Sequence, residues 1–448
     1  MNTFILRINS TVLICILMSC ASTGNFKTLQ QKAQKGDAYS QNKLGILYER
    51  GEGVVKSDSL AVYWYRKAAE QGEMYAQNNL GIMYTDGRGV RQDYSEAAKW
   101  YGKAAIQNYD WAQYNLGNLY RFGRGITKNL EEGFRLMQLA SEQGNTDAKQ
   151  VLALMYLEGT GVAKNPTLAH DIFIRLSKNS NVYTQRFSQH HLGRMNRFGL
   201  GIPQDYDKAY NWLHKSADLG FHPAQFMLGA MYSLGEGGRK DTTKSIGWYT
   251  KAATEGHRES QFVLGSKYSR GNGVPKDNAK AMAWYLKAAE RGHSGALNNI
   301  GEMYRLGSGV PQSFSKAIEW YNKAIEKKSA IAYSNLGELY EAGQGFPVDT
   351  AEAFKNYLKA IELGSGLPVK RLFEYHMAKQ NPAEAYVYVL LAKSDKLETY
   401  NEEIRRDFEN LLLQESTIMQ RLSEQERALA EQKANKLLSP EPKDKVEE

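Results

Sequence analysis

A block of 36 residues recurs along most of this sequence, and this periodicity constrains the fold more than any other feature. Each block begins with a Leu-Gly pair or its equivalent and continues to a Gly-x-Gly, as in Leu80 to Gly89. A fixed period of roughly 20–50 residues indicates a solenoid, in which each unit buries its apolar face only against its neighbours. One spacing, between Leu152 and Leu192, is 40 residues instead of 36. The leading residues of the nine copies are Leu44, Leu80, Leu116, Leu152, Leu192, Leu228, Leu264, Ile300 and Leu336.

Each block carries the pattern of a helical hairpin. In the second copy, Ala76, Leu80 and Met83 fall on one face of a first helix. Ala97 and Tyr101 fall on one face of a second helix beyond the Gly-x-Gly. The sequence therefore predicts an all-α fold, in which about nine helix-turn-helix repeats of 36 residues stack into an α-solenoid superhelix with capping helices at its ends.

The residues between the two helices are typical of helix punctuation. The first glycine of Gly-x-Gly suits a helix C-terminus that needs a positive φ, and the second allows the chain to reverse tightly. Three copies also have capping-box spacing: Asp93 with Glu96, Asn129 with Glu132 and Asp349 with Glu352. Four residues beyond the second glycine, every copy has a strong N-cap residue: Ser57, Asp93, Asn129, Asn165, Asp205, Asp241, Asp277, Ser313 and Asp349.

The second helix of most copies carries an aromatic pair, such as Trp100-Tyr101 or Trp284-Tyr285, followed by small residues. Large rings fill the space between helices, and small residues let the helices approach each other. We interpret this stripe as core packing rather than as a ligand site.

The composition excludes several classes of protein. Apolar residues make up 42% and aromatic residues 11% of the chain, which is typical of a folded protein rather than a disordered one. The net charge of +8 is small for 448 residues and has no basic cluster, so we expect no nucleic-acid partner. The two cysteines are Cys15 and Cys20, so the repeats contain neither disulfides nor thiolate metal ligands.

The first residues have the pattern of a secretory signal. Arg7 precedes an apolar core from Val12 to Met18, which is too short to span a bilayer. Leu17-Met18-Ser19-Cys20 resembles the lipobox of bacterial lipoproteins, which implies that residues 1–19 are removed and Cys20 is acylated. Ala21 resembles the residue that directs such proteins to the outer membrane. An uncleaved or ordinary secretory N-terminus is the alternative.

The repeated pattern Leu-Gly-x-x-Tyr-x-x-Gly-x-Gly-Val, followed by Asp, Ala, Trp-Tyr-x-x-Ala-Ala and Gly, resembles the Sel-one-like repeat (SLR) family, relatives of the tetratricopeptide repeat. The resemblance implies an α-solenoid and a role as an adaptor or assembly platform for other proteins. The expected organisation is a signal peptide at 1–19, a linker and capping helix at 20–37, nine repeats at 38–364, a C-terminal helical cap at 365–438 and a disordered tail at 439–448.

The middle of the array departs from the pattern. The third and fourth copies replace Trp-Tyr with Leu136-Met137 and Ile172-Phe173, and Asn196 stands where the other copies have tyrosine. The four extra residues fall somewhere within residues 178–189. We expect a change of superhelical curvature and lower local stability here, with simple sequence drift as the alternative.

The chain shows no catalytic constellation. None of the Gly-x-Gly pairs is completed as a phosphate-binding loop, and neither a Gly-x-Ser-x-Gly nor a His-Glu-x-x-His motif is present. His190-His191 is the one histidine cluster, and no acidic residue or cysteine lies beside it at ligand spacing. We therefore expect no enzyme, no cofactor and no metal site.

A binding surface is expected on the first helices. Side chains five and two residues before the leading leucine, and two and five residues after it, lie opposite that leucine on a helix. In tetratricopeptide-like solenoids the first helices line the concave surface, and the aromatic, amide and arginine side chains found here are enriched at interfaces. Packing between neighbouring first helices is the alternative. The predicted partner-binding residues are Trp111, Tyr114, Asn118, Arg121, Arg194 and Arg197.

These features predict a lipid-anchored, non-catalytic scaffold on the periplasmic side of the bacterial envelope, which holds a protein or peptide partner. Recognition of an envelope glycan or exported polysaccharide is the alternative, and a hydrolase is a third hypothesis.

Overall fold

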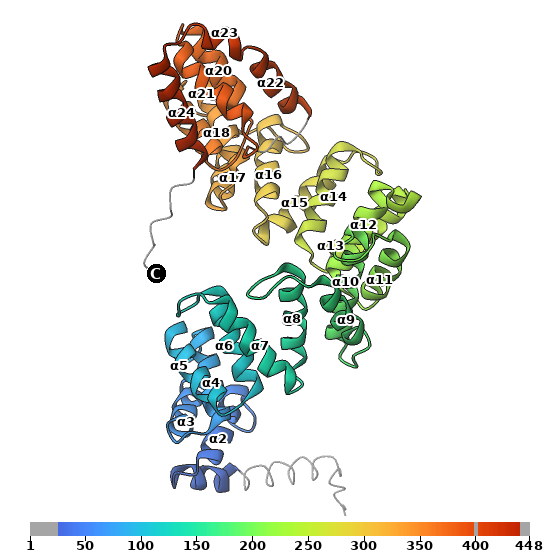
Figure 1. Ribbon diagram of the computed structural model, residues 1–448, viewed down its shortest axis with the longest axis vertical. Coiled ribbons are helices and arrows are strands. Elements are labelled where there is room, and N and C mark those ends of the chain that lie inside the picture. Colours follow the sequence, from blue (N-terminus) through green and yellow to red (C-terminus); the bar gives the residue numbers. More distant parts are fainter. Residues whose placement is uncertain (1–25, 398–401, 440–448) are drawn as a thin grey trace, which may run out of the picture. The chain divides into compact units, whose positions relative to one another are not determined.

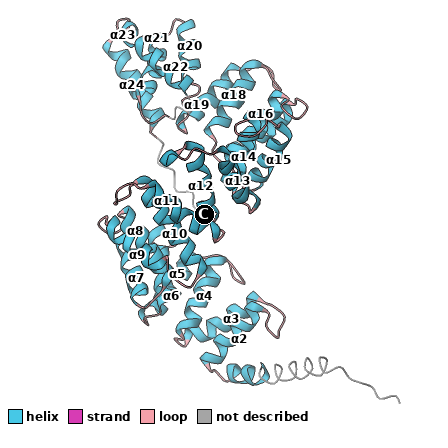
Figure 2. Cartoon of the chain, turned by 90° about the vertical axis from the view of Figure 1, so that its right-hand side faces the viewer, coloured by secondary structure: helices cyan, strands magenta, loops and turns pink. Residues whose placement is uncertain are grey.

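The computed structural model describes residues 26–397 and 402–439, and these residues form helices joined by turns and loops (Figure 2). The all-α solenoid expected from the repeats is confirmed. The predicted signal peptide, Cys20 and residues 440–448 of the predicted tail lie outside the described residues. Among the helices described, none is both long and apolar enough to cross a membrane.

The chain divides into two compact units, residues 1–224 and 225–448. Residues 26–34 are helical and pack against the first repeat through Phe26, Leu29 and Ala33. The N-terminal unit then contains α2 (Ala38–Arg50), α3 (Asp58–Glu70), α4 (Met74–Asp86), α5 (Tyr94–Ile106), α6 (Asp110–Phe122), α7 (Leu130–Glu142), α8 (Thr146–Glu158), α9 (Pro166–Leu176), α10 (Val182–Phe198) and α11 (Tyr206–Asp218).

Helix α12 (His222–Leu234) contains the boundary between the units. The C-terminal unit continues with the 3-10 turn η1 (Glu236–Gly238), α13 (Thr242–Thr254), α14 (Arg258–Arg270), α15 (Asn278–Glu290), α16 (Ser294–Leu306), α17 (Phe314–Glu326), α18 (Ala330–Ala342) and α19 (Thr350–Glu362). Five more helices follow: α20 (Val369–Ala378), α21 (Pro382–Lys393), α22 (Glu402–Leu413), α23 (Glu415–Met419) and α24 (Glu424–Leu438).

Within each unit, the helices pack in chain order. The first and second helices of a repeat form an antiparallel hairpin, and the second helix packs against the first helix of the next repeat, as α2, α3 and α4 show (Figure 1). This is the arrangement that lets each repeat bury its apolar face against a neighbour.

The predicted helix punctuation is present in all nine repeats. Each predicted N-cap side chain accepts a hydrogen bond from a backbone N–H of the following turn, as Asp277 does from Lys280 at 2.9 Å. The first glycine of each loop ends its helix in the left-handed region, as Gly87 does with φ 68°.

The capping-box prediction was wrong for the three candidate pairs in the repeats. The N3 glutamates bind a basic side chain one turn further along instead, and Arg135 holds Glu132 with two hydrogen bonds of 2.7 and 2.8 Å. The box does not form because the backbone N–H of each N-cap residue already donates to a tyrosine carbonyl, as Asp93 does to Tyr84 at 3.0 Å. A reciprocal box does form at Ser423 and Glu426, at the start of α24.

In the repeats that keep both the glycine of the Leu-Gly pair and the tyrosine of the aromatic pair, these two residues meet inside the hairpin. In the second repeat, a Cβ on Gly81 would lie 2.6 Å from the Tyr101 ring, so the glycine allows the buried ring to lie flat against α4. The tyrosine hydroxyl then reaches the residue five positions after the leading leucine: Tyr101 bonds Thr85 at 3.0 Å, and Tyr65 donates to Glu49 at 2.6 Å. The tyrosine therefore fills the core with its ring and joins the two helices of the hairpin with its hydroxyl group.

The tryptophan of the aromatic pair is less buried than the core interpretation predicted. Trp64 is 8% exposed, but Trp100 and Trp284 are only partly buried. A lysine ammonium lies over several of these rings, 4.0 Å from the centroid for Lys103 over Trp100. The tryptophan still packs against the core, as predicted, but it lies at the edge of the interface where the lysine stem can cover it.

The second glycine of the loop belongs to the contact between repeats. A Cβ on Gly125 would overlap the backbone of Tyr94, at the start of the preceding repeat's second helix, and Gly89 stands in the same relation to Asp58. A Cβ on Gly53, in the first repeat, would meet nothing within 4 Å. Where a repeat precedes it, glycine is therefore needed for close approach as well as for its positive φ.

The four extra residues of the 40-residue spacing extend one helix. Helix α10 has 17 residues, whereas the first helices before it have 13, and the addition lies at its N-terminal end. Helix α9 is shortened to 11 residues. The fifth repeat therefore begins with an additional helical turn, which includes Tyr183.

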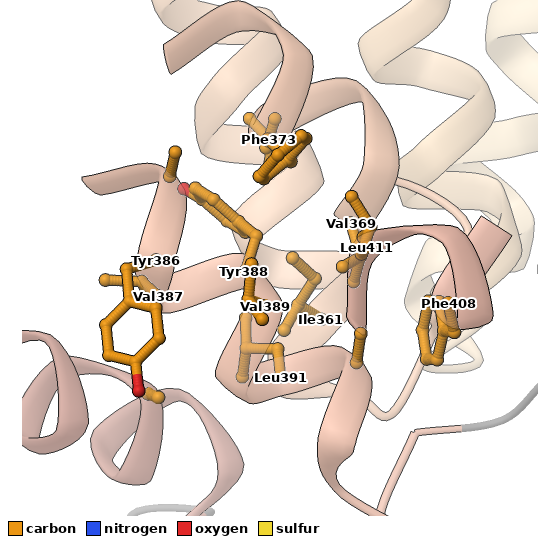
Figure 3. Close-up of a cluster of buried hydrophobic side chains, with 14 of the residues drawn as sticks. Ile361, Val369, Phe373, Tyr386, Val387, Tyr388, Val389, Leu391, Phe408 and Leu411 are labelled. Carbon is orange, nitrogen blue, oxygen red and sulfur yellow. The ribbon is translucent and has the colours of Figure 1, made fainter. Parts of the chain in front are cut away.

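The C-terminal helices close the array with a larger core. Helix α20, which the sequence pattern did not reveal, pairs with α21, and α24 packs against both α21 and α19. Figure 3 shows Phe373, Tyr388 and Leu391 among the side chains that meet there. Ile404, Phe408 and Leu411, which share one face of α22, are buried in the same cluster.

Candidate functional site

Three of the asparagines two positions before the leading residues, Asn42, Asn78 and Asn298, do not face the surface. Asn78 is 4% exposed, and its Oδ1 accepts a hydrogen bond from Nδ2 of Asn115 in the next first helix, at 3.0 Å. Asn42 and Asn298 accept equivalent bonds from Asn79 and Asn335, at 3.1 and 2.9 Å. These three asparagines therefore pack between neighbouring first helices, which was the alternative to a binding surface, and their amides join those helices.

One hollow of about 850 Å³ lies on the first-helix face of the N-terminal unit. It is formed mainly by α6 and α8, with contributions from α4, α5 and the start of α10. Its lining is aromatic, amide-bearing and basic. The lining residues are Thr85, Tyr94, Tyr101, Tyr114, Asn115, Asn118, Leu119, Arg121, Phe122, Arg124, Asp147, Gln150, Val151, Leu154, Asn181, Tyr183 and Phe187.

Three of the six predicted partner-binding residues line this hollow together: Tyr114, Asn118 and Arg121. Trp111 lies beside them. Its ring is 43% exposed and meets the Tyr114 ring edge-on, with 5.9 Å between centroids. Burial raises the pKa of the Tyr114 hydroxyl, which keeps this group a neutral hydrogen-bond donor at physiological pH.

Arg194 and Arg197 are not part of the hollow. Arg194 lies 3.4 Å from His191 Nδ1, and Arg197 is 8% exposed with its guanidinium 4.7 Å from the centre of the Phe198 ring. Helical spacing gave the direction of these side chains but not the packing that surrounds them. Only the residues of the third repeat share one surface.

The additional turn of α10 supplies lining residues that the sequence analysis missed. Asn181, the N-cap of α10, and Tyr183, which is 52% exposed, both reach the hollow. The 40-residue spacing was the one sequence feature that indicated extra residues here. It did not show whether these residues lie in a loop or in a helix, because the helix ends were not known.

Arg121 is the main charged group of the hollow. It is half-buried, and its Nη1 donates to Asn118 Oδ1 at 3.0 Å. Within the described part of the chain it forms no ion pair. Burial lowers the pKa of its guanidinium, although an arginine remains charged. The one lining carboxylate is Asp147, which accepts from Gln150 Nε2 at 3.3 Å.

The histidine pair of α10 is buried among aromatic rings. His190 and His191 are each 7% exposed and lie among Phe173, Phe187 and Phe221. Burial lowers the pKa of His190 to about 3 and also lowers that of His191. In the described residues, no group of three or more His, Cys, Asp or Glu side chains is placed to hold a metal ion.

Comparison with known proteins identifies the repeats. The Sel1 repeat family matches nine segments: residues 38–73, 75–109, 112–145, 147–181, 187–221, 222–257, 258–293, 294–329 and 330–365. A search of curated proteins gave no match.

Two solved structures illustrate the similarity. A protective antigen present in uropathogenic Escherichia coli strains, which displays an SLR fold, is 30% identical over 93% of this chain and 95% of the antigen, with a TM-score of 0.47. A Sel1 repeat protein from Oxalobacter formigenes is 28% identical over 70% of this chain and 89% of that protein, with a TM-score of 0.51.

Proposed function

The chain belongs to the Sel1 repeat family, and we propose that it is a non-catalytic scaffold of the bacterial cell envelope that holds a protein or peptide partner. A Sel1 repeat solenoid is generally a protein-interaction scaffold, and the family match indicates no enzyme class. The finer parts of the proposal are the binding surface, the lipid anchor and the location on the periplasmic side of the outer membrane.

The hollow on the third and fourth repeats carries the proposal for the binding surface. Its volume of about 850 Å³ lies within the range of protein ligand sites, roughly 300–1,000 Å³. Tyrosine and arginine, which dominate interface hot spots, lie together there in Tyr114, Tyr183 and Arg121. Trp111 adds an exposed aromatic ring at the edge.

Capture from the native envelope tests this surface. Cross-linking in cells, followed by mass spectrometry, should identify a partner with the wild-type protein and lose it when Trp111→Ala and Arg121→Ala are combined. Tyr63→Ala is a matched control, because Tyr63 is 48% exposed but lies on the second helix α3, away from the hollow. Unchanged capture by the double variant would exclude the hollow as the binding surface.

The sequence Leu17-Met18-Ser19-Cys20 supports the anchor. Lipid attached to Cys20 by two or three acyl chains would hold the protein stably on the membrane, whereas a single chain binds only marginally. Metabolic labelling with a fatty-acid probe should mark the wild-type protein and not Cys20→Ala. Membrane fractionation that is the same for both proteins would contradict the anchor.

Glycan recognition is the competing function. Amide and tyrosine side chains such as Asn118 and Tyr114 can hold hydroxyl groups. Binding to purified cell-wall glycan that is lost in Tyr114→Ala would favour this alternative, whereas capture of a specific protein by the wild type with no glycan binding would exclude it.

A further inference from the structure

The eighth repeat shows one way in which this scaffold pairs an arginine at the position of Arg121. There, Arg305 of α16 forms two hydrogen bonds of 2.9 and 2.8 Å with the Glu302 carboxylate. The hydroxyl of Tyr321, from the second helix, donates to the same carboxylate. Glu302 raises the pKa of Arg305, so the charge is neutralised within the repeat.

The third repeat has the same arginine without its acidic partner. Arg121 corresponds to Arg305, five residues after the leading leucine, but Asn118 replaces the glutamate and Met137 replaces the tyrosine. The Asn118 amide accepts from the guanidinium but carries no charge. Glu158 acts on the guanidinium only as a nearby charge and forms no ion pair with it. The half-buried Arg121 therefore loses hydration without a directly bonded carboxylate, which is costly.

Gly133 adds a second departure at the same place. The other repeats have alanine or serine at this position, which is Ala317 in the eighth repeat and Ala97 in the second. A Cβ on Gly133 would lie 2.7 Å from Cγ of Arg121. The stem of Arg121 therefore occupies the space that a methyl group takes elsewhere, and the guanidinium is directed along a different path from that of Arg305.

A second arginine lies on the same rim. The guanidinium carbons of Arg121 and Arg124 are 5.2 and 5.4 Å from the centre of the Phe122 ring, which is 59% exposed. Arg124, like Arg121, has no ion pair within residues 26–397 and 402–439. Asp147 is the one carboxylate in the lining, so the hollow presents two positive groups against one negative group.

We propose that the Arg121 hollow binds the carboxylate of an acidic, extended peptide segment of the partner protein, which takes the place that Glu302 fills in the eighth repeat. This inference rests on the proposed scaffold function and names the chemistry of its partner. Arginine pairs with carboxylates through two parallel hydrogen bonds, and the eighth repeat forms such a pair on the same scaffold positions. The lining tyrosines Tyr114 and Tyr183 would contact the flanking residues.

Matched peptides test the charge requirement. The probes are fluorescent decapeptides with amidated C-termini, in which two adjacent glutamates are retained or replaced by glutamines, with the flanking residues varied across aromatic, aliphatic and polar types. A second set has no acidic side chain and a free C-terminal carboxylate, which distinguishes a side chain from a chain end as the source of the carboxylate. Affinity is measured by anisotropy with the full-length protein.

We expect wild-type protein to bind the carboxylate peptides roughly tenfold or more tightly than their glutamine or amidated counterparts. Asn118→Glu should remove this preference, because it supplies the internal partner that Glu302 provides for Arg305. Glu302 occupies the equivalent position, so the variant is expected to fold, and circular dichroism checks this. Lys103→Gln changes the net charge equally on a second helix and should leave the preference intact.

Equal binding, or no binding, of each matched pair by the wild type would overturn the inference, as would a preference that persists in Asn118→Glu. These failures are distinguishable from failure of the scaffold function. Partner capture that depends on Trp111 but tolerates Asn118→Glu would retain the scaffold and exclude the carboxylate, whereas an absence of any captured partner would remove both.

Discussion

The contact between Gly81 and Tyr101 gives a prediction whose magnitude can be worked out from the structure. In Gly81→Ala, the new methyl group would lie 2.6 Å from the ring, and ordinary contact begins near 3.4 Å. The ring must therefore move by about 0.8 Å, which strains its hydrogen bond to Thr85. Such overpacking costs about 1–3 kcal/mol, while alanine in a helix gains only about 0.5–1 kcal/mol over glycine. The central values of these ranges give an expected net loss of about 1 kcal/mol.

Gly102→Ala is the control within the same repeat. Gly102 is interior to α5, and a Cβ there would meet nothing within 4 Å. The same chemical change should therefore stabilise the protein by about 0.5–1 kcal/mol. Urea titration followed by circular dichroism compares the unfolding midpoints of the two variants.

The two variants should shift the midpoint in opposite directions. If both raised it, the Gly81–Tyr101 contact would not restrict packing, and glycine would be replaceable. The fourth repeat has Ala153 opposite Phe173, which lacks the hydroxyl group. Adding Tyr101→Phe to Gly81→Ala should therefore recover part of the loss, since the ring is then free of its bond to Thr85.

Three further predictions concern single positions. Replacing His190 and His191 with asparagine should make stability less sensitive to acid. The pKa of each histidine in the folded protein is below 6.5, so as pH falls from about 6.5 the unfolded chain takes up protons first, and the free energy of unfolding decreases by up to about 1.4 kcal/mol per pH unit for each histidine. Parallel curves of unfolding free energy against pH for variant and wild type would contradict this prediction. Lys267→Met should stabilise the protein by roughly 1 kcal/mol in thermal unfolding. Lys267 is 7% exposed at a position where the other eight repeats have Leu or Met, and burial lowers the pKa of its ammonium group. A lower melting temperature of the variant would contradict this prediction. Asp277→Ala should cost about 1 kcal/mol in urea unfolding through loss of the N-cap, whereas Asp277→Asn should stay within a few tenths; equal effects would exclude capping as the cause.

Sequence reasoning was reliable where the physics is local. Asp277 and the other N-caps, the glycine C-caps and the start of α21 at Pro382 depend on a few adjacent residues, so their patterns predict the helix ends directly. The repeats were predicted because nine copies average out local drift. Helix α20 lacks the repeat pattern and has no side-chain N-cap, so no comparable signal marked its start.

The candidate site was predicted only in part. Helical spacing placed Tyr114, Asn118 and Arg121 on one face, but it could not show that Asn78, with the same spacing, is covered by the neighbouring helix. That Met137 takes the place of a tyrosine that would contact the first helix near Arg121 could in principle be inferred from the sequence. It required knowing that in other repeats the tyrosine at the position of Met137 forms a hydrogen bond with a first-helix side chain, such as Thr85 or Glu302, and this is a contact between helices.

The glycine that ends each loop motif has a consequence for how such a chain changes length. Gly89, Gly125 and Gly161 each rest on the backbone of the preceding repeat's second helix, at Asp58, Tyr94 and Leu130, so the side chains at those three positions are free to differ. A tandem duplication of the second or third repeat carries both halves of this backbone contact with it, whereas Gly201 and Gly273 of later repeats meet the side chains of Pro166 and Thr242. Gene recombination can therefore add a copy of the second or third repeat without a matching side-chain change at this contact, while a deletion that splits a repeat separates the glycine from its support.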